Sequence, residues 1–119
     1  MLSFLINLYP YKLDFKKKEP IELNISIKNM DNRLKSVIIN ISLDNTLSFN
    51  SKALKSSLIQ KINPLQNNEE KHFRFKIYPS KGMHPGKSVH SGIVKVYEYL
   101  LDSGELDNVY EKPIKINVF

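Results

Sequence analysis

The stretch PIELNISIKN, residues 20–29, alternates apolar and polar side chains along its whole length. After the turn-like segment NMDNR, residues 36–44 repeat the pattern as SVIINISLD. Because successive side chains of a β-strand point to opposite faces of the sheet, this alternation predicts two half-buried strands. The side chains expected to point inward are Ile21, Leu23, Ile25, Ile27, Val37, Ile39, Ile41 and Leu43. The two strands should therefore form a hairpin or face each other.

Similar patterns flank this pair on both sides. Residues 2–9 place Phe4, Ile6 and Leu8 on one face, and after Pro10 a second short piece follows with Leu13 and Phe15. A proline break of this kind is typical of an edge strand that changes partner. Near the other end, residues 91–110 contain a DSG turn and predict one arm of an antiparallel hairpin, whose second arm continues into EKPIKINVF.

Residues 51–62 are open to two interpretations. Leu54, Leu58 and Ile62 are spaced by four, as in a helix that begins at Ser51 and stops at Pro64. From Ser57 onward the same residues also give a strand that carries Leu58, Gln60 and Ile62 on one side. We favour a strand preceded by a short helical turn, because the surrounding segments are all β.

Length and composition indicate one globular domain over residues 1–119. A chain of 119 residues with 41% hydrophobic and 25% charged residues can build one core but not two. It contains no cysteine, which excludes disulfides and thiolate zinc sites. No segment approaches the roughly 18 apolar residues of a membrane-spanning helix, which predicts a soluble chain. The opening MLSFLINLYPY lacks the basic leader of a signal peptide.

That opening leads to two expectations for localisation. If Met1 is the native start, the missing signal peptide places the protein in the cytoplasm. If the domain is excised from a larger surface protein, it is extracellular.

The net charge of +6 raises the question of a nucleic-acid partner. Arginine, which suits bidentate phosphate contacts, occurs only at Arg33 and Arg74, and the lysines are scattered. In KHFRFKIYP, residues 71–79, a period of two puts Phe73, Phe75 and Ile77 on one face and the basic residues on the other. A stacking platform needs rings and cations on the same face, so this segment predicts a core strand.

Catalytic and metal-binding patterns are not found in the sequence. It has no glycine-rich phosphate loop, no nucleophile elbow and no cysteine nucleophile, and its acids gather between Glu98 and Glu111 in an expected solvated hairpin. The spacing of His72, His84 and His90 matches no metal signature. We therefore expect a protein that is not an enzyme and that needs no cofactor or metal.

Residues 12–119 resemble the immunoglobulin-like domains of the CARDB type from archaeal and bacterial surface and adhesion proteins. Three segments carry the resemblance in order: ISIKNMDNRLKSVIINISL, IQKINPLQNNEEKHFRF and HPGKSVHSGIVKVYEY. The ending EYLLDSGELD departs from that family's acidic, asparagine-rich pattern. The expected fold is an all-β, immunoglobulin-like Greek-key β-sandwich of about seven strands, with an OB-type fold as the competitor.

For function, the sequence predicts a non-catalytic protein–protein interaction or structural module; the alternative is a single-stranded nucleic-acid binder with a basic strand face. The expected partner is a protein, and the lysines favour an acidic one. The binding residues expected for it are His72, Arg74, Lys76 and Tyr78 on one strand, Lys95, Tyr97 and Tyr99 on the penultimate strand, and Lys81 and Lys87 in a loop.

If the two strands are neighbours, the two sets lie side by side and form one binding face, and the register of residues 89–100 decides whether that face exists. In one register Tyr97 and Tyr99 point to solvent. In the other they point inward with Ile93, and Val94 and Val96 cover the outer face. The loop from Lys81 to Lys87 is the better candidate in the second case.

Overall fold

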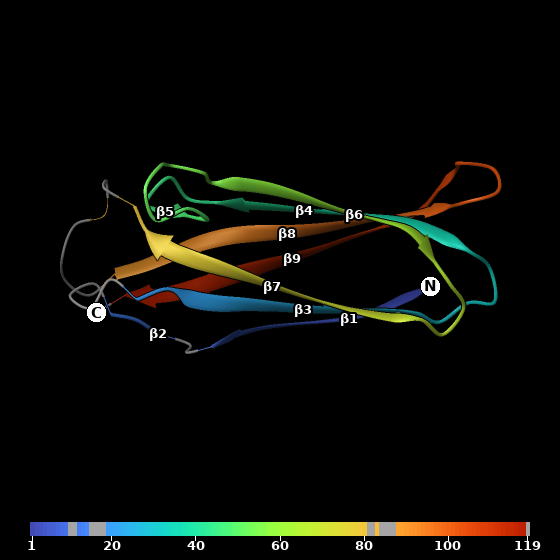
Figure 1. Cartoon of the computed structure of the whole chain (residues 1–119), viewed down its shortest axis with the longest axis horizontal. Helices are drawn as coiled ribbons and strands as arrows, with labels where there is room; N and C mark the ends of the chain where they lie inside the picture. Colours follow the sequence, from blue (N-terminus) through green and yellow to red (C-terminus); the bar gives the residue numbers. More distant parts are fainter. Residues whose placement is uncertain (10–11, 15–18, 81–82, 84–87, 119) are drawn as a thin grey trace.

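The computed structural model describes residues 1–9, 12–14, 19–80, 83 and 88–118. These residues form two β-sheets packed face to face, in a body of 49 × 21 × 20 Å (Figure 1). None of them forms a helix long and apolar enough to cross a membrane.

Each sheet combines strands from distant parts of the sequence. The four-stranded sheet has the order β1 (Leu2–Tyr9), β3 (Ile21–Asn29), β7 (Glu70–Pro79), β5 (Leu47–Ser48). The five-stranded sheet has the order β2 (Lys12–Leu13), β9 (Leu106–Val118), β8 (Ser88–Leu100), β4 (Lys35–Leu43), β6 (Ser57–Leu65). All neighbours pair antiparallel except β2 and β9, which are parallel. Within the described ranges, seven strands have eight or more residues and two have only two, which agrees with the expected number.

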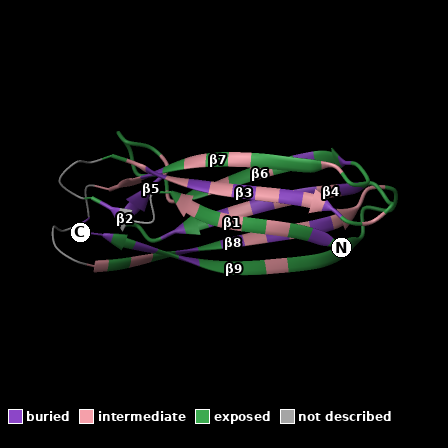
Figure 2. Ribbon diagram, turned by 90° about the horizontal axis from the view of Figure 1, so that it is seen from below, coloured by how far each residue is buried: buried purple, intermediate pink, exposed green. Residues whose placement is uncertain are grey.

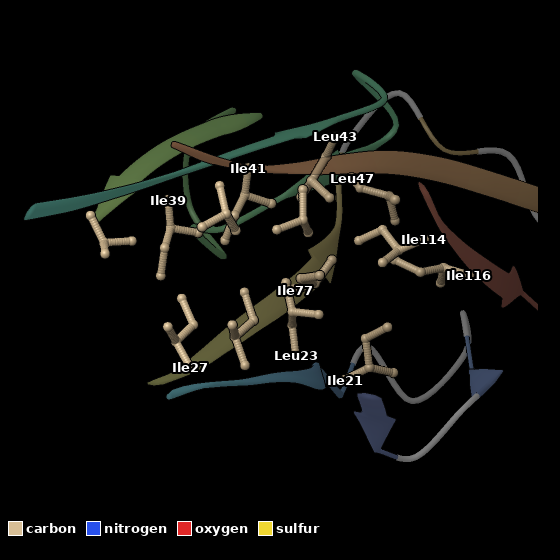
Figure 3. Close-up of a cluster of buried hydrophobic side chains, with 14 of the residues drawn as sticks. Ile21, Leu23, Ile27, Ile39, Ile41, Leu43, Leu47, Ile77, Ile114 and Ile116 are labelled. Atoms are coloured by element: carbon tan, nitrogen blue, oxygen red, sulfur yellow. The ribbon is translucent and has the colours of Figure 1, made fainter. Parts of the chain in front are cut away.

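The core lies between β3 and β4, which face each other instead of forming a hairpin. Their inward side chains are those that the alternation predicts, and all are buried. Figure 3 shows Ile39 and Ile41 of β4 projecting toward Leu23 and Ile27 of β3. The phenylalanines of β7 point to the same interior and pack against this cluster while remaining partly buried. The segment KHFRFKIYP is therefore a core strand, as predicted.

The N-terminal segment changes sheets, as the proline break predicts. β1 pairs with β3 at the edge of the four-stranded sheet, whereas β2 pairs with β9 at the edge of the five-stranded sheet. Leu13 is fully buried, and Phe4, Ile6 and Leu8 are partly buried against the core. Pro10 and Phe15 lie outside the described residues.

Residues 57–65 form strand β6, but the helical turn expected before it is wrong. Residues 49–53 form bends. The buried Ser48 hydroxyl accepts hydrogen bonds from the backbone N–H groups of Asn50 and Lys55 at 3.1 and 2.9 Å and donates one to the Ala53 carbonyl at 2.8 Å. These side-chain contacts replace the backbone hydrogen bonds between residues four apart that a helical turn would require.

The C-terminal hairpin confirms the predicted antiparallel arms. β8 and β9 have 13 residues each, and they pair along their whole length apart from a register shift at Glu98 and Tyr99. The turn contains Gly104 at φ 73°, a left-handed conformation that glycine adopts without steric cost. Its N–H donates to the Leu100 carbonyl at 2.8 Å, which closes the turn.

Candidate functional site

The basic residues predicted on β7 lie on the outer face of the four-stranded sheet. His72, Arg74 and Lys76 are exposed and Tyr78 is half-buried. Acids of the same sheet lie beside them: Arg74 Nε is 3.7 Å from a carboxylate oxygen of Glu22, and His72 Nε2 is 3.8 Å from one of Glu70. The face therefore carries both signs of charge.

The residues predicted on β8 lie on the outer face of the other sheet. Lys95, Tyr97 and Tyr99 are half-buried and point outward, whereas Val94 and Val96 are fully buried. Figure 2 shows this alternation along the strand. The register with outward tyrosines is thus the one adopted.

The two predicted sets do not form one surface. β7 belongs to the four-stranded sheet and β8 to the five-stranded sheet, and each set points away from the core that separates them. The expectation that they lie side by side is therefore wrong, because alternation fixes the face of a side chain but not which strands are neighbours. Lys81 and Lys87 lie outside the described residues.

Tyr97 and Tyr99 belong to an apolar patch on the outer face of the five-stranded sheet. Residues paired directly across antiparallel strands point to the same side of the sheet. Tyr97 is opposite Ile38 of β4 and Val109 of β9, and Tyr99 is opposite Leu106. The apolar patch comprises Ile38, Ile59, Tyr97, Tyr99, Leu106 and Val109. Val109 and Leu106 are 51% and 52% exposed.

The equivalent face of the four-stranded sheet is polar at its centre. The outward side chains of β3 are all polar or charged: Glu22, Asn24, Ser26 and Lys28. The first three are opposite the basic residues of β7, and Lys28 is opposite Glu70. Thus the two outer faces of the sandwich differ in chemistry.

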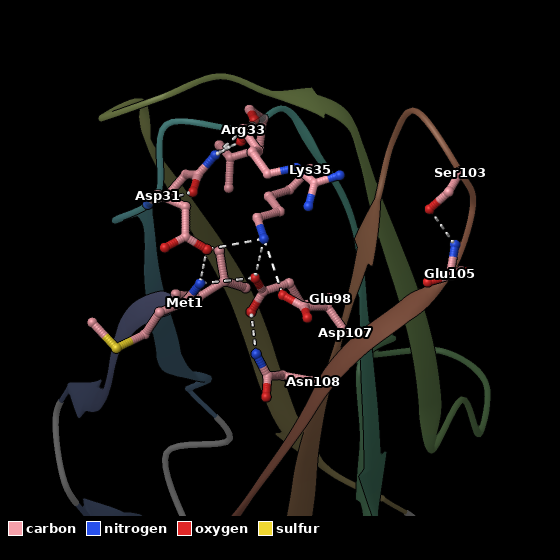
Figure 4. Close-up of polar contacts among 12 residues, drawn as sticks. Met1, Asp31, Arg33, Lys35, Glu98, Ser103, Glu105, Asp107 and Asn108 are labelled. Carbon is pink, nitrogen blue, oxygen red and sulfur yellow. Dashed lines mark hydrogen bonds and ion pairs between the residues drawn. The ribbon is translucent and has the colours of Figure 1, made fainter.

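A second feature is an ion cluster at one end of the sandwich (Figure 4). The Lys35 ammonium lies 2.9 Å from Glu98, 3.0 Å from Asp31 and 3.1 Å from Asp107, measured from Nζ to carboxylate oxygen. The Lys35 and Glu98 side chains are only 1% and 0% exposed. The cluster links the β3–β4 connection, β4, β8 and β9.

Glu98 has further partners that complete its hydrogen bonding. The Tyr110 hydroxyl donates to Glu98 Oε1 at 2.8 Å, and the Met1 ammonium donates to Oε2 at 3.1 Å. The same ammonium donates to Asp31. No buried side-chain nitrogen or oxygen among the described residues is without a partner. The cluster is therefore a satisfied buried network.

The contacts keep these groups charged. Burial alone raises the pKa of Glu98, but hydrogen bonds from Lys35, Tyr110 and the Met1 ammonium together lower it below its ordinary value. Burial alone lowers the pKa of Lys35, but hydrogen bonds to Glu98, Asp31 and Asp107 raise it. Hydrogen bonds from the Met1 ammonium and Lys35 lower the pKa of Asp31.

The geometry of the three acids also bears on metal binding. One carboxylate oxygen each from Asp31, Glu98 and Asp107 lies within 4.8 Å of the others, close enough to share a cation. However, the Lys35 ammonium hydrogen-bonds all three and takes the position that a metal ion would need. The arrangement is that of an ion-pair network and gives no argument for a metal centre.

The described histidines make separate local contacts. His72 on β7 hydrogen-bonds the Ser26 hydroxyl at 2.7 Å, and His90 on β8 hydrogen-bonds Thr46 at 2.6 Å and Ser88 at 2.8 Å. They belong to different sheets. His84 lies outside the described residues.

The expectation that Glu98 lies in a solvated hairpin is wrong, because its side chain is buried, and the sequence contains a signal for this. Lys35 is in phase with the inward positions Val37 and Ile39, and Glu98 is in phase with Val94 and Val96. Extending each alternation by one step places a charged residue inside the sandwich at both positions. Buried charges of opposite sign on neighbouring strands predict a pair, because neither is tolerated alone.

Comparisons with known proteins support the fold. No protein-family model and no curated protein sequence matches the chain. Solved structures that resemble it include native α2-macroglobulin of Escherichia coli, from domain MG7 to the C-terminus, with a TM-score of 0.66 and 12% identity over 98% of this chain and 16% of that one. The major pilin subunit BcpA of Bacillus cereus gives a TM-score of 0.62 and 12% identity over 99% of this chain and 40% of that one.

A β-glucosidase of Listeria innocua, in complex with glucose, is a third similar structure. Its TM-score is 0.52, with 20% identity over 98% of this chain and 16% of that one. The chain thus spans less than half of each of these three structures, and the low identities bear on the fold alone. The fold is an immunoglobulin-like β-sandwich.

Removing one partner of the buried pair is predicted to cost far more than removing an exposed pair. Lys35→Met leaves the buried Glu98 carboxylate without its main partner, and we expect the free energy of unfolding to fall by about 3–5 kcal/mol in urea denaturation. The double variant Lys35→Met with Glu98→Leu should lose less than the sum of the single variants.

The matched control is Arg33→Met. Arg33 pairs with Asp102 at 2.9 Å, with side chains 52% and 70% exposed. Its loss should cost less than about 1 kcal/mol. Equal losses for Arg33→Met and Lys35→Met would contradict the structural role of the cluster.

The pKa directions also predict a pH dependence of stability. The pKa of Glu98 is lowered by folding, so its contribution is present above the unfolded value of about 4.3 and is lost as the pH falls through the folded value. The pKa of Lys35 is raised, so its contribution persists below about pH 10.4 and is lost only at higher pH. Denaturation series should show stability falling in acid, with a shallower fall for Glu98→Gln. An unchanged acid slope in that variant would contradict the assignment.

Proposed function

We propose that the chain is a non-catalytic protein-binding module that contacts its partner through the apolar patch of the five-stranded sheet. The observation that carries this proposal is the placement of Tyr97 and Tyr99 beside Ile38, Val109 and Leu106 on one outer face. Contiguous apolar surface of this kind mostly marks an interaction site. The outer face of the four-stranded sheet is polar and therefore suited to contact with solvent.

The composition of the apolar patch fits a protein interface. Tyrosine contributes a large contact area with few rotatable bonds and is enriched among the residues that dominate binding energy. Tyr97 lies on a central strand between Ile38 and Val109, where surrounding side chains can exclude water from it. We therefore expect Tyr97 to contribute the most.

The charges around the apolar patch favour a partner with some acidic groups. Lys95 points outward on β8 beside Tyr97, and Lys61 of β6 lies opposite Ile38. Glu111 lies opposite Lys95 and compensates part of that charge. Lysines at such positions steer an acidic partner and affect its association rate more than its final affinity.

The mixed charge of the β7 face argues against the nucleic-acid alternative. Glu22 lies opposite Lys76 and near Arg74, so it offsets part of the positive potential that a phosphate backbone requires. The phenylalanines of β7 point into the core and do not offer stacking surfaces.

The proposal that the chain is not a catalyst is supported by the residues that line a surface hollow. A hollow beside the 49–56 loop is lined by Asn45, Ser48, Asn50, Ser51, Lys52, Ala53, Leu54, Pro79 and Ser80. Among these residues only Lys52 has an ionisable side chain, so the hollow lacks an acid–base pair. The acids of the ion cluster are already engaged by Lys35.

We also propose that the chain is a domain of the CARDB type. Support comes from the order of the sequence motifs and from the immunoglobulin-like sandwich. An extracellular location would follow if the domain belongs to a larger surface protein.

Photo-crosslinking is predicted to distinguish the two outer faces. A benzophenone-bearing amino acid in place of Tyr97 should give one discrete protein adduct in extract of the source cells, because Tyr97 lies at the centre of the contact. The same amino acid in place of Lys76, on the outer face of β7, should give none. The readout is the adduct pattern on a denaturing gel, followed by mass spectrometry.

Ile38→Asp provides the specificity control. Ile38 is half-buried on the outer face, so this variant should remain folded while the adduct yield from position 97 falls at least about tenfold. Protein adducts from position 76 and none from position 97 would contradict the proposed face. Adducts with nucleic acid from position 76 would support the alternative function instead.

A further inference from the structure

β1 forms an open edge of the four-stranded sheet. Among the described residues it pairs only with β3. The Met30 N–H donates to the Met1 carbonyl at 3.0 Å, which makes Met1 a residue whose backbone groups point toward β3. In an antiparallel pair such residues alternate with residues whose N–H and C=O groups point away. The residues of β1 whose backbone groups point to the open side are Leu2, Phe4, Ile6 and Leu8.

One of these four residues already has a partner on the open side. The Leu2 N–H donates to the Tyr110 hydroxyl at 3.1 Å. The Tyr110 ring also meets the Phe4 ring edge-on at 5.3 Å, and Lys112 Nζ lies 5.5 Å from the centre of the Phe4 ring. No hydrogen bond within the described part of the chain reaches the outward backbone groups of Phe4, Ile6 and Leu8.

β1 also differs from the other open edges in lacking protection. An edge strand is normally blunted by charged side chains or proline, which oppose pairing with another strand. β6 carries Lys61 and Pro64, and the open part of β7 carries Lys71, Arg74 and Lys76. β9 carries Glu111, Lys112, Pro113 and Lys115. β1, with the sequence LSFLINLY, carries neither charge nor proline.

We propose that β1 pairs antiparallel with β1 of a second copy of this chain, around a two-fold axis at Ile6. Pairing centred on Ile6 places Phe4 opposite Leu8 of the other copy. In this register all three residues with available backbone groups gain hydrogen-bond partners. The Tyr110 contact to Leu2 is left intact. The two four-stranded sheets then form one continuous sheet across the dimer.

The chemistry of β1 favours a second copy over a charged foreign strand. Self-pairing brings no like charges opposite each other, since β1 has none. The half-buried side chains of Phe4, Ile6 and Leu8 become more buried against the other copy. Leu5 is 61% exposed on the outer side, and it gains Asn7 of the other copy as a cross-strand neighbour. The contact is isologous and closes after two copies.

The small size of this contact predicts a weak dimer. Interfaces of one strand pair fall among the transient ones, with a Kd between about 1 µM and 1 mM. The net charge of +6 on each copy opposes association. Because salt screens that repulsion, the dimer should tighten as the salt concentration rises, whereas an interface held by ion pairs would weaken.

The test is sedimentation equilibrium of the full chain up to about 1 mM, at roughly 0.05 and 0.5 M salt. The expected result is a monomer–dimer equilibrium that is tighter at the higher salt. Leu5→Lys, at an exposed position in the pairing, should raise the Kd at least about tenfold by bringing two added charges close to the axis. Circular dichroism checks that the variant remains folded.

The matched control is Leu54→Lys, in the loop between β5 and β6, where Leu54 is 62% exposed against 61% for Leu5. This variant should leave the Kd unchanged. A chain that stays monomeric at every concentration, a dimer that Leu5→Lys leaves intact, or an equal loss with Leu54→Lys would each overturn the proposal. None of these results bears on the apolar patch, which contains neither Leu5 nor Leu54.

Discussion

The two-residue alternation of β3 and β4 is the constraint on which the rest of the structure depends. Their inward side chains, from Ile21 to Ile27 and from Val37 to Leu43, face one another and exclude solvent from the centre of the molecule. A shift of one residue in either strand would turn every side chain of that strand to the opposite face of its sheet. Through the strand pairing, this choice of face also sets the direction of Tyr97 on β8 and of Arg74 on β7. The chemistry of both outer faces therefore follows from the core.

The ion cluster places charged side chains in a largely apolar interior, and its position explains how they are tolerated. Lys35 begins β4 and Glu98 comes near the end of β8, so the pair lies at one end of the core, where Asp31, Asp107 and the Met1 ammonium reach it from the surface. Each buried charge has several partners, which offsets its desolvation. The network joins β4, β8 and β9 at the end where the β8–β9 hairpin extends beyond the sandwich (Figure 1).

The sequence predicted the direction of side chains well and the spatial order of strands poorly. Alternation correctly placed Leu58 and Ile62 on the inner side of β6 and Ile114 and Ile116 on that of β9. It could not reveal that β7 and β8 belong to different sheets, because pairing between distant segments leaves no periodic signal in either one. Nor could it predict the bends at 49–53, which depend on one buried hydroxyl, that of Ser48.

Thiol labelling along β8 tests the central claim most directly, because the chain contains no cysteine and each single replacement is therefore unambiguous. Cysteines introduced one at a time at positions 94–97 and at position 99 should react with a soluble maleimide at alternating rates under native conditions. We expect fast labelling for Lys95→Cys, Tyr97→Cys and Tyr99→Cys, and slow labelling at the even positions. The opposite phase would bury the tyrosines and contradict both the register and the apolar patch.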